Sequence, residues 1–262
     1  MLLSTLIIVL REILEAALVI SLLLVFTRLR GIDARWVLYG LGAGMVGAVI
    51  YASQIARVSE MFEYTGQEIT NASMQVAIFI SLAILTVLIC RPAPHRTRLV
   101  SILMALVVAL AVAREGFEIL LYLSGLMTKP ELVTPLLLGT ILGTGIGCSI
   151  GALFYYGLLN FSPRSGQTIA LLLLALFGGN MLSQAAQMLI QADLLPAGAT
   201  LWDSSRILPE DSLAGQLFYA LIGYEATPTL MQLTAYLGGL GLLLALALPG
   251  IAIQRRQALQ PE

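Results

Sequence analysis

Two copies of one charged pentapeptide lie inside otherwise apolar stretches of the chain. Residues 11–15 read Arg-Glu-Ile-Leu-Glu, and residues 114–118 read Arg-Glu-Gly-Phe-Glu. On a helix with 3.6 residues per turn, the last glutamate of each copy shares a face with the arginine four positions earlier and the glutamate three positions earlier. Charged side chains inside a bilayer are costly unless they pair, line a polar cavity or bind a ligand. The two motifs are therefore the residues most able to form a functional site.

Four glutamates, one pair from each motif, could surround a small and highly charged cation. Carboxylate oxygens are hard ligands, which suit Fe³⁺, Mg²⁺, Ca²⁺ or Mn²⁺ better than soft Cu⁺. The arginine of each motif is an i,i+4 partner for its second glutamate and offsets part of the negative charge. The predicted metal ligands are Glu12, Glu15, Glu115 and Glu118, and the predicted charge-balancing residues are Arg11 and Arg114.

The net charge of the two motifs separates two interpretations. Four carboxylates and two guanidinium groups leave a residual charge of minus two. A cation site needs such an excess, whereas buried salt bridges that only lock the bundle do not. We favour the cation site, because the motif occurs twice and ionisable residues inside membranes are functional by default.

The composition is that of a helical membrane protein. Of the 262 residues, 58% are hydrophobic and 11% are charged, and the mean hydropathy is +0.91, whereas soluble domains carry about 25% charged residues. No basic tract or zinc-finger spacing indicates a nucleic-acid partner. The single histidine, His95, excludes a His-Glu-x-x-His zinc enzyme. Without a nucleophile elbow or a phosphate-binding loop, we predict no enzymatic activity.

Seven apolar stretches are long enough to cross a bilayer, which takes about 20 helical residues. We therefore predict an all-α polytopic membrane protein with seven transmembrane helices in a single domain over residues 1–262, with the lipid bilayer as its surroundings. The predicted spans cover approximately residues 2–27, 36–56, 71–90, 99–126, 132–159, 167–191 and 229–250.

Loop charges predict the orientation. Nine of the 14 basic residues fall in the tail and in the loops after the first, third and fifth spans, and nine acidic residues crowd on the opposite side. The positive-inside rule places the basic side in the cytoplasm. The N-terminus is then outside and the C-terminus is cytoplasmic, as seven spans require. We predict a multi-pass protein of the cytoplasmic (inner) membrane.

The sequence also predicts an inverted repeat. The two motifs lie 103 positions apart on spans that run in opposite directions, because the spans are three apart. One repeat covers about residues 1–98, and the other covers about residues 99–192. An outer loop of about residues 192–228 and a seventh helix of about residues 229–250 follow. Such transporters bind their cargo near the midplane, where the repeats meet. At the same offset, three small residues of the second span map onto the fifth: Gly40, Gly44 and Ala48 onto Gly143, Gly147 and Gly151.

The sixth span carries a stripe of amides. Asn180, Gln184 and Gln187 share one helical face. They could line a path for the cation, or they could make hydrogen bonds between helices, because both uses place polar side chains in the bundle interior.

Three glutamates lie between the second and third spans. Glu60 and Glu63 form a Glu-x-x-Glu pair outside the membrane, and Glu68 is close in sequence. They could capture a cation before it reaches the membrane site. A solvated acidic loop is the alternative interpretation.

Together, the two motifs, the seven spans and the outer Glu-x-x-Glu pair resemble the oxidase-dependent iron permeases, also called the iron/lead transporter family. Residues 201–205 (Leu-Trp-Asp-Ser-Ser) and 223–225 (Gly-Tyr-Glu) are similar to bacterial members. The resemblance covers the whole chain. It implies that the four motif glutamates bind Fe³⁺ for import across the cytoplasmic membrane, and that Glu60 and Glu63 form an outer capture site.

The resemblance also implies partners. An extracytoplasmic oxidase, either a haem peroxidase or a multicopper oxidase, supplies Fe³⁺, and an iron-binding periplasmic protein is a further candidate. Fe³⁺ is then the transported substrate, and no cofactor is bound permanently. One position departs from the family pattern: many members have glycine where this chain has Ile13, so the packing there must differ from that around Gly116.

Three alternatives stay open. The transporter could carry Pb²⁺, Mn²⁺ or Fe²⁺, because oxygen ligands discriminate poorly among such ions. The paired carboxylates could act as acid and base in an intramembrane enzyme, although no other catalytic motif accompanies them. The chain could also be a non-transporting scaffold whose charged pairs only lock the bundle.

Overall fold

The computed structural model describes residues 1–90, 96–210 and 212–258, so His95 and residues 259–262 of the predicted domain lie outside the described part. The described residues form eight α-helices and no β-strand. The helices are α1 (Leu2–Arg30), α2 (Trp36–Glu60), α3 (Gly66–Cys90), α4 (Thr97–Leu126), α5 (Pro130–Leu159), α6 (Pro163–Gln191), α7 (Leu213–Ile222) and α8 (Leu230–Ala258).

Within the described residues, six helices are long and apolar enough to cross a membrane: α2, α3, α4, α5, α6 and α8. They correspond to the second to seventh predicted spans. Helix α1 is as long, with 29 residues, but it carries three charged residues midway and two arginines in its last turn. The chain is therefore a multi-pass helical membrane protein.

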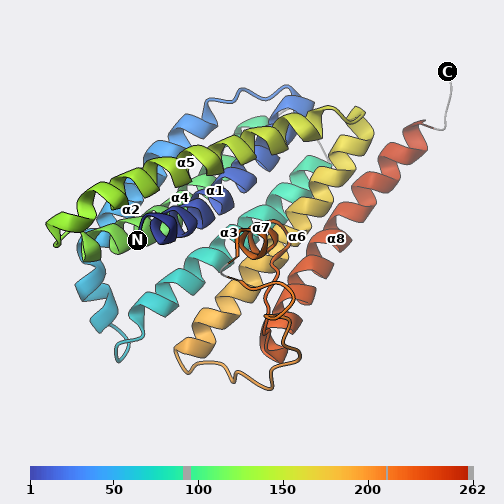
Figure 1. Ribbon diagram of the computed structural model, residues 1–262. Coiled ribbons are helices and arrows are strands. Elements are labelled where there is room, and N and C mark those ends of the chain that lie inside the picture. Colours follow the sequence, from blue (N-terminus) through green and yellow to red (C-terminus); the bar gives the residue numbers. More distant parts are fainter. Residues whose placement is uncertain (91–95, 211, 259–262) are drawn as a thin grey trace.

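The short helix α7 lies in the stretch that we predicted as a plain outer loop. It begins after Ser212, whose Oγ accepts a hydrogen bond from the backbone N–H of Gly215 at 3.0 Å, as N-cap serines do. It ends at Gly223, which has the left-handed conformation typical of helix C-termini (φ 68°). Figure 1 shows α7 almost along its axis, beside the middle of α6.

Helix α5 packs closely on α1 through a ridge of glycines spaced four apart. Small residues let two helix backbones approach each other in a membrane. The contacts advance in the same direction along both helices, so α5 and α1 run parallel. Gly139 faces Thr5, Gly143 faces Val9, Gly147 faces Ile13 and Gly151 faces Ala17.

Helix α2 packs on α4 in the same way. Its small residues again meet partners that advance in the same direction, so these two helices also run parallel. Gly40 faces Val108, Gly44 faces Val112 and Ala48 faces Gly116.

These contacts correct the predicted register of the ridges. Gly40 meets Val108 and Gly139 meets Thr5, and Val108 and Thr5 are 103 positions apart. Gly40 is therefore the counterpart of Gly139 and not of Gly143, so the predicted mapping was wrong by one helical turn. The cause is that the stretch between motif and ridge is four residues shorter in the second copy.

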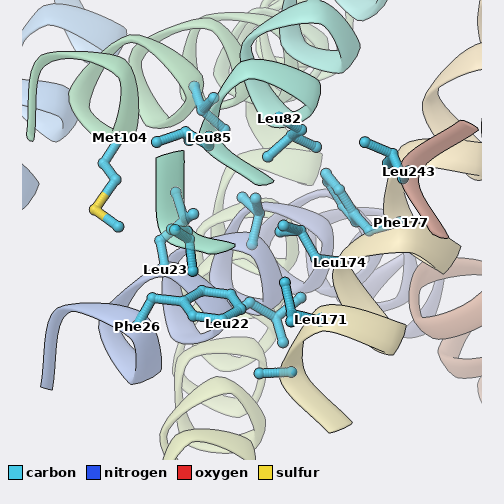
Figure 2. Packing of buried hydrophobic residues seen from close by; sticks show 14 of the residues in the cluster. Leu22, Leu23, Phe26, Leu82, Leu85, Met104, Leu171, Leu174, Phe177 and Leu243 are labelled. Atoms are coloured by element: carbon cyan, nitrogen blue, oxygen red, sulfur yellow. The ribbon is translucent and has the colours of Figure 1, made fainter. Parts of the chain in front are cut away.

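Apolar packing fills the half of the bundle on one side of the charged motifs. On α1 the core residues follow the motif, whereas on α4 they precede it, as expected for helices that run in opposite directions. Figure 2 shows this core, with side chains from five helices pointing toward one another. The labelled residues are Leu22, Leu23, Phe26, Leu82, Leu85, Met104, Leu171, Leu174, Phe177 and Leu243.

The ridge contacts explain the departure at Ile13, and they predict the effect of adding a methyl group. A Cβ at Gly147 would lie 2.7 Å from Cγ2 of Ile13, whereas a Cβ at Gly145 on the same helix would meet nothing within 4 Å. We expect Gly147→Ala to lower the free energy of unfolding by about 1–3 kcal/mol, the usual range for overpacking. Denaturant unfolding of the purified protein in detergent measures this, with Gly145→Ala as the matched control.

A second substitution tests the cause. Ile13→Gly combined with Gly147→Ala recreates the Gly116–Ala48 pair between α4 and α2, and it should recover most of the stability lost in Gly147→Ala. A double variant no more stable than Gly147→Ala would show that the Ile13 contact is not the cause.

Candidate metal-binding site

The two charged motifs meet where α1 and α4 pack together. One carboxylate oxygen each of Glu12, Glu115 and Glu118 lies within 4.8 Å of the others. Glu12 and Glu115 are buried, with 5% and 4% of their surface exposed, and Glu118 is half-buried. The cluster thus takes ligand oxygens from both motifs, which suits a hard cation.

The fourth predicted ligand, Glu15, is not part of this cluster. Its carboxylate pairs with two arginines instead. Its Oε2 is 3.3 Å from Nη2 of Arg114, and its Oε1 is 3.7 Å from Nε of Arg11. Nε2 of Gln184 also donates to Oε2 at 3.3 Å. Glu15 is 1% exposed, so these groups take the place of water around its charge.

Arg114 joins the two motifs. Its Nη2 reaches Glu15 on α1, its Nε donates to Glu115 at 3.0 Å, and its Nη1 donates to Oε1 of Gln184 on α6 at 2.7 Å. We expected the i,i+4 pair with Glu118, but among the described ion pairs those of Arg114 are to Glu15 and Glu115. The planar guanidinium group can bind two carboxylates and an amide together. Glu118 therefore remains in the carboxylate cluster.

Arg11 has different surroundings from its counterpart. Its side chain is 39% exposed, compared with 6% for Arg114. The guanidinium carbon lies 4.3 Å from the ring centroid of Tyr219, a cation–π contact. Helix α7, which the sequence did not reveal, therefore contacts the first motif.

The amide stripe divides into residues with different partners. Gln184 belongs to the charge network described above. Asn180 is 2% exposed and donates to the backbone oxygen of Tyr219 on α7 at 3.5 Å. Gln187 is half-buried, and among the described contacts it belongs neither to the charge network of Gln184 nor to the contact of Asn180 with α7.

Sequence reasoning missed a matching pair of amides on α3. Gln75 is fully buried and donates to Oε1 of Gln184 at 2.7 Å. Asn71 is 5% exposed and accepts a hydrogen bond from the hydroxyl of Tyr51 at 3.2 Å. The signal was in the sequence, because Asn-x-x-x-Gln occurs at 71–75 and again at 180–184.

Of the three glutamates predicted to lie outside the membrane, the structure brings Glu68 to the site. Glu68 lies in the first turn of α3 and shares a cavity of about 350 Å³ with Glu118. Oε2 of Glu68 is buried and has no hydrogen-bond partner. Glu60 and Glu63 are exposed and do not line this cavity. The remaining lining residues are Gln67, Asn71, Leu121, Tyr122, Met188 and Gln191.

These observations define a multi-pass membrane protein with a buried carboxylate cluster that one cavity reaches. The chain belongs to the iron permease FTR1 family, whose model matches residues 2–258. This confirms the resemblance noted from the sequence, and it places the chain among the membrane permeases for iron and not among enzymes. Comparison with curated proteins and with solved structures gave no match.

The different surroundings of the two arginines predict different effects of removing them. Arg114→Met leaves Glu15 and Glu115 buried beside one another without their cation, which should lower the free energy of unfolding by about 3–5 kcal/mol. Arg11→Met leaves Arg114 in place on Glu15 and should cost clearly less. Denaturant unfolding in detergent compares the two variants, and equal losses would contradict this account of the network.

Proposed function

We propose that the chain imports Fe³⁺ across the cytoplasmic membrane through the glutamates of its two motifs. The observation that carries the proposal is the grouping of Glu12, Glu115 and Glu118, from both repeats, with ligand oxygens within 4.8 Å of one another. Three carboxylates offer hard oxygen ligands and negative charge to a small trivalent ion. Glu15 becomes a ligand when its arginine partners move, so that all four glutamates serve the cation during transport.

The helix packing supports an inverted repeat of α1–α3 and α4–α6. The main contacts are preserved when α1, α2 and α3 are exchanged with α4, α5 and α6: α1 on α5 becomes α4 on α2, and α3 on α4 becomes α6 on α1. Helix α5 is parallel to α1 and follows α4 after a short turn, so α1 and α4 run in opposite directions. Because α4 qualifies as a span, we infer that its counterpart α1 is the seventh span. The positive-inside rule then puts the N-terminus outside and the C-terminus in the cytoplasm.

The cavity beside Glu118 supports an approach from the outer side. It is lined by the first turns of α3 and the last turns of α4 and α6, which the positive-inside rule places outside. Glu68 is then the outer capture residue nearest the site, with Glu60 and Glu63 further out. Asn71 and Gln191 offer further oxygen atoms along the way.

We further propose that a separate extracytoplasmic oxidase, a haem peroxidase or a multicopper oxidase, produces the Fe³⁺ that enters this cavity. An iron-binding periplasmic protein is a second candidate partner. Fe³⁺ is cargo in this scheme, and no cofactor is needed. The membrane potential favours cation import by about 2.3 kcal/mol per charge per 100 mV.

Uptake of radioactive iron into proteoliposomes tests the proposal. We expect wild-type protein to take up Fe³⁺, and Glu118→Gln to lose uptake by more than about tenfold, since a ligand should matter at least as much as its supporting residues. Glu131→Gln, at an exposed glutamate in the first turn of α5, is the control. Uptake of Fe²⁺, Mn²⁺ or Pb²⁺ in preference to Fe³⁺ would change the cargo, and full uptake by Glu118→Gln would refute the site.

The capture residues predict a difference in concentration dependence. Glu68→Gln removes a carboxylate from the cavity and should raise the half-saturating Fe³⁺ concentration several-fold, because fewer charges attract the cation. Combined Glu60→Gln and Glu63→Gln should change it less, because both side chains are exposed outside the cavity. Initial uptake rates across a range of Fe³⁺ concentrations decide which carboxylates capture the ion.

A further inference from the structure

Arg114 is held by a buried amide. Its Nη1 donates to Oε1 of Gln184 at 2.7 Å, and the same oxygen accepts a hydrogen bond from Nε2 of Gln75 at 2.7 Å. Because a guanidinium group only donates, the atom of Gln184 that faces it must be oxygen. Nε2 of Gln184 then donates to Glu15 at 3.3 Å.

Gln75 is the counterpart of Gln184, but its own acceptor is unused. The two glutamines end matching Asn-x-x-x-Gln sequences on α3 and α6, and these helices pack against each other. Oε1 of Gln75 is buried without a hydrogen-bond partner in a side chain with 0% exposure. Unpaired buried acceptors are unfavourable and rare, so such an atom in a native structure needs an explanation.

Arg11 is the counterpart of Arg114, but its ion pair with Glu15 is long, at 3.7 Å, and includes no hydrogen bond from Nε. This nitrogen is buried. The guanidinium group lies on the ring of Tyr219 instead of on an amide. One motif therefore holds its arginine on a glutamine, while on the other side an arginine nitrogen and a glutamine oxygen both lack a hydrogen bond.

We propose that Gln75 binds Arg11 in a second conformation, in which the two repeats exchange their arrangements. Arg11 then donates to Oε1 of Gln75, and Nε2 of Gln184 donates to the same oxygen. Each hydrogen bond of the present network has its counterpart, and the unpaired oxygen gains two donors. The inference rests on the proposed function, since inverted repeats transport by alternating access around a central site.

The exchange also changes the third ligand of the cation. At present, Glu12 and Glu115 are grouped with Glu118, while Glu15 is held by arginine. The counterpart arrangement groups Glu115 and Glu12 with Glu15, and Arg11 holds Glu118. Glu12 and Glu115 bind the cation in both conformations. The third ligand changes from Glu118 to Glu15, which moves the cation from the side of the cavity to the opposite side.

Helix α7 covers the side from which the cation leaves. Leu121 on α4 lines the open cavity, and its counterpart 103 positions earlier, Leu18 on α1, lies beside Ala220 of α7 and is 2% exposed. Tyr219, the neighbouring residue of α7, is the one that contacts Arg11. Transfer of Arg11 to Gln75 therefore removes a contact that keeps α7 over Leu18.

Two cysteine reporters in metal-free, detergent-solubilised protein test the proposal. Each cysteine is introduced into a Cys90→Ala, Cys148→Ala background, and its rate of reaction with a water-soluble maleimide is measured. Leu18→Cys reports the second conformation, and Leu121→Cys reports the present one. We expect Gln75→Leu to slow the reaction at Leu18→Cys about tenfold, the size of one hydrogen bond to a charged group, and to leave Leu121→Cys reactive.

The matched variant is Gln184→Leu, which removes the partner of Arg114 and should speed the reaction at Leu18→Cys about tenfold. The double variant should return close to the parent, because both conformations then lack one amide. If the two amides only supported packing, losing either one would loosen the protein and raise the maleimide reaction rate at Leu18→Cys. Rates that rise in both single variants, or change in neither, therefore overturn the proposal. If Gln75→Leu is not monodisperse, Gln75→Met serves instead, since it keeps the side-chain length without an acceptor oxygen.

Iron uptake separates this inference from the identity of the cargo. Because labelling uses metal-free protein, opposite shifts at Leu18→Cys support the role of Gln75 even if proteoliposomes take up an ion other than Fe³⁺. Conversely, Fe³⁺ uptake without opposite shifts leaves the ferric permease standing and refutes the role of Gln75.

Discussion

Six ionisable side chains inside a membrane bundle, four of them buried, are the constraint on which the rest of this structure depends. Removing one partner from a buried ion pair leaves an uncompensated charge and costs about 3–5 kcal/mol, so each charged group must be met by another group inside the bundle. Arg114 on α4 meets Glu15 on α1 at 3.3 Å, and this contact ties one motif helix to the other. The charged motifs are therefore both the most costly part of the bundle and the link between its halves.

The glycine ridges follow from this constraint. The charges can meet only if α1 and α4 hold a fixed depth, yet between membrane helices the hydrophobic effect gives little attraction. Close backbone contact replaces it: a Cβ at Gly143 would lie 2.8 Å from the backbone oxygen of Leu6, and one at Gly44 would lie 2.9 Å from that of Ala109. Each motif helix thus has a parallel supporting helix in fixed register, which sets both motifs at the same level.

Much of this could be predicted, because hydropathy and motif symmetry are properties of single segments. The apolar stretches located α2 to α6 and α8, and the repeated motif indicated that α1 and α4 meet. What could not be predicted depends on tertiary distances: the preference of Arg114 for Glu15, and the position of Glu68, instead of the outer Glu-x-x-Glu pair, at the cavity. Helix α7 was missed because its ten residues are too few to span a bilayer, so only its contacts with α1 and α6 determine where it lies.

Two copies of one motif with unlike surroundings are what the proposed inverted repeat requires when its site opens to one side. Apolar packing closes the half of the bundle beyond Glu15, whereas the half beyond Glu118 contains the cavity. In the proposed mechanism, these differences between equivalent residues indicate which side the site faces. Residue pairs that differ, such as the two arginines, are then those that move when the site faces the other way. Glu12 and Glu115 are similarly buried, so in this proposal they have equivalent places in both arrangements and remain with the cation.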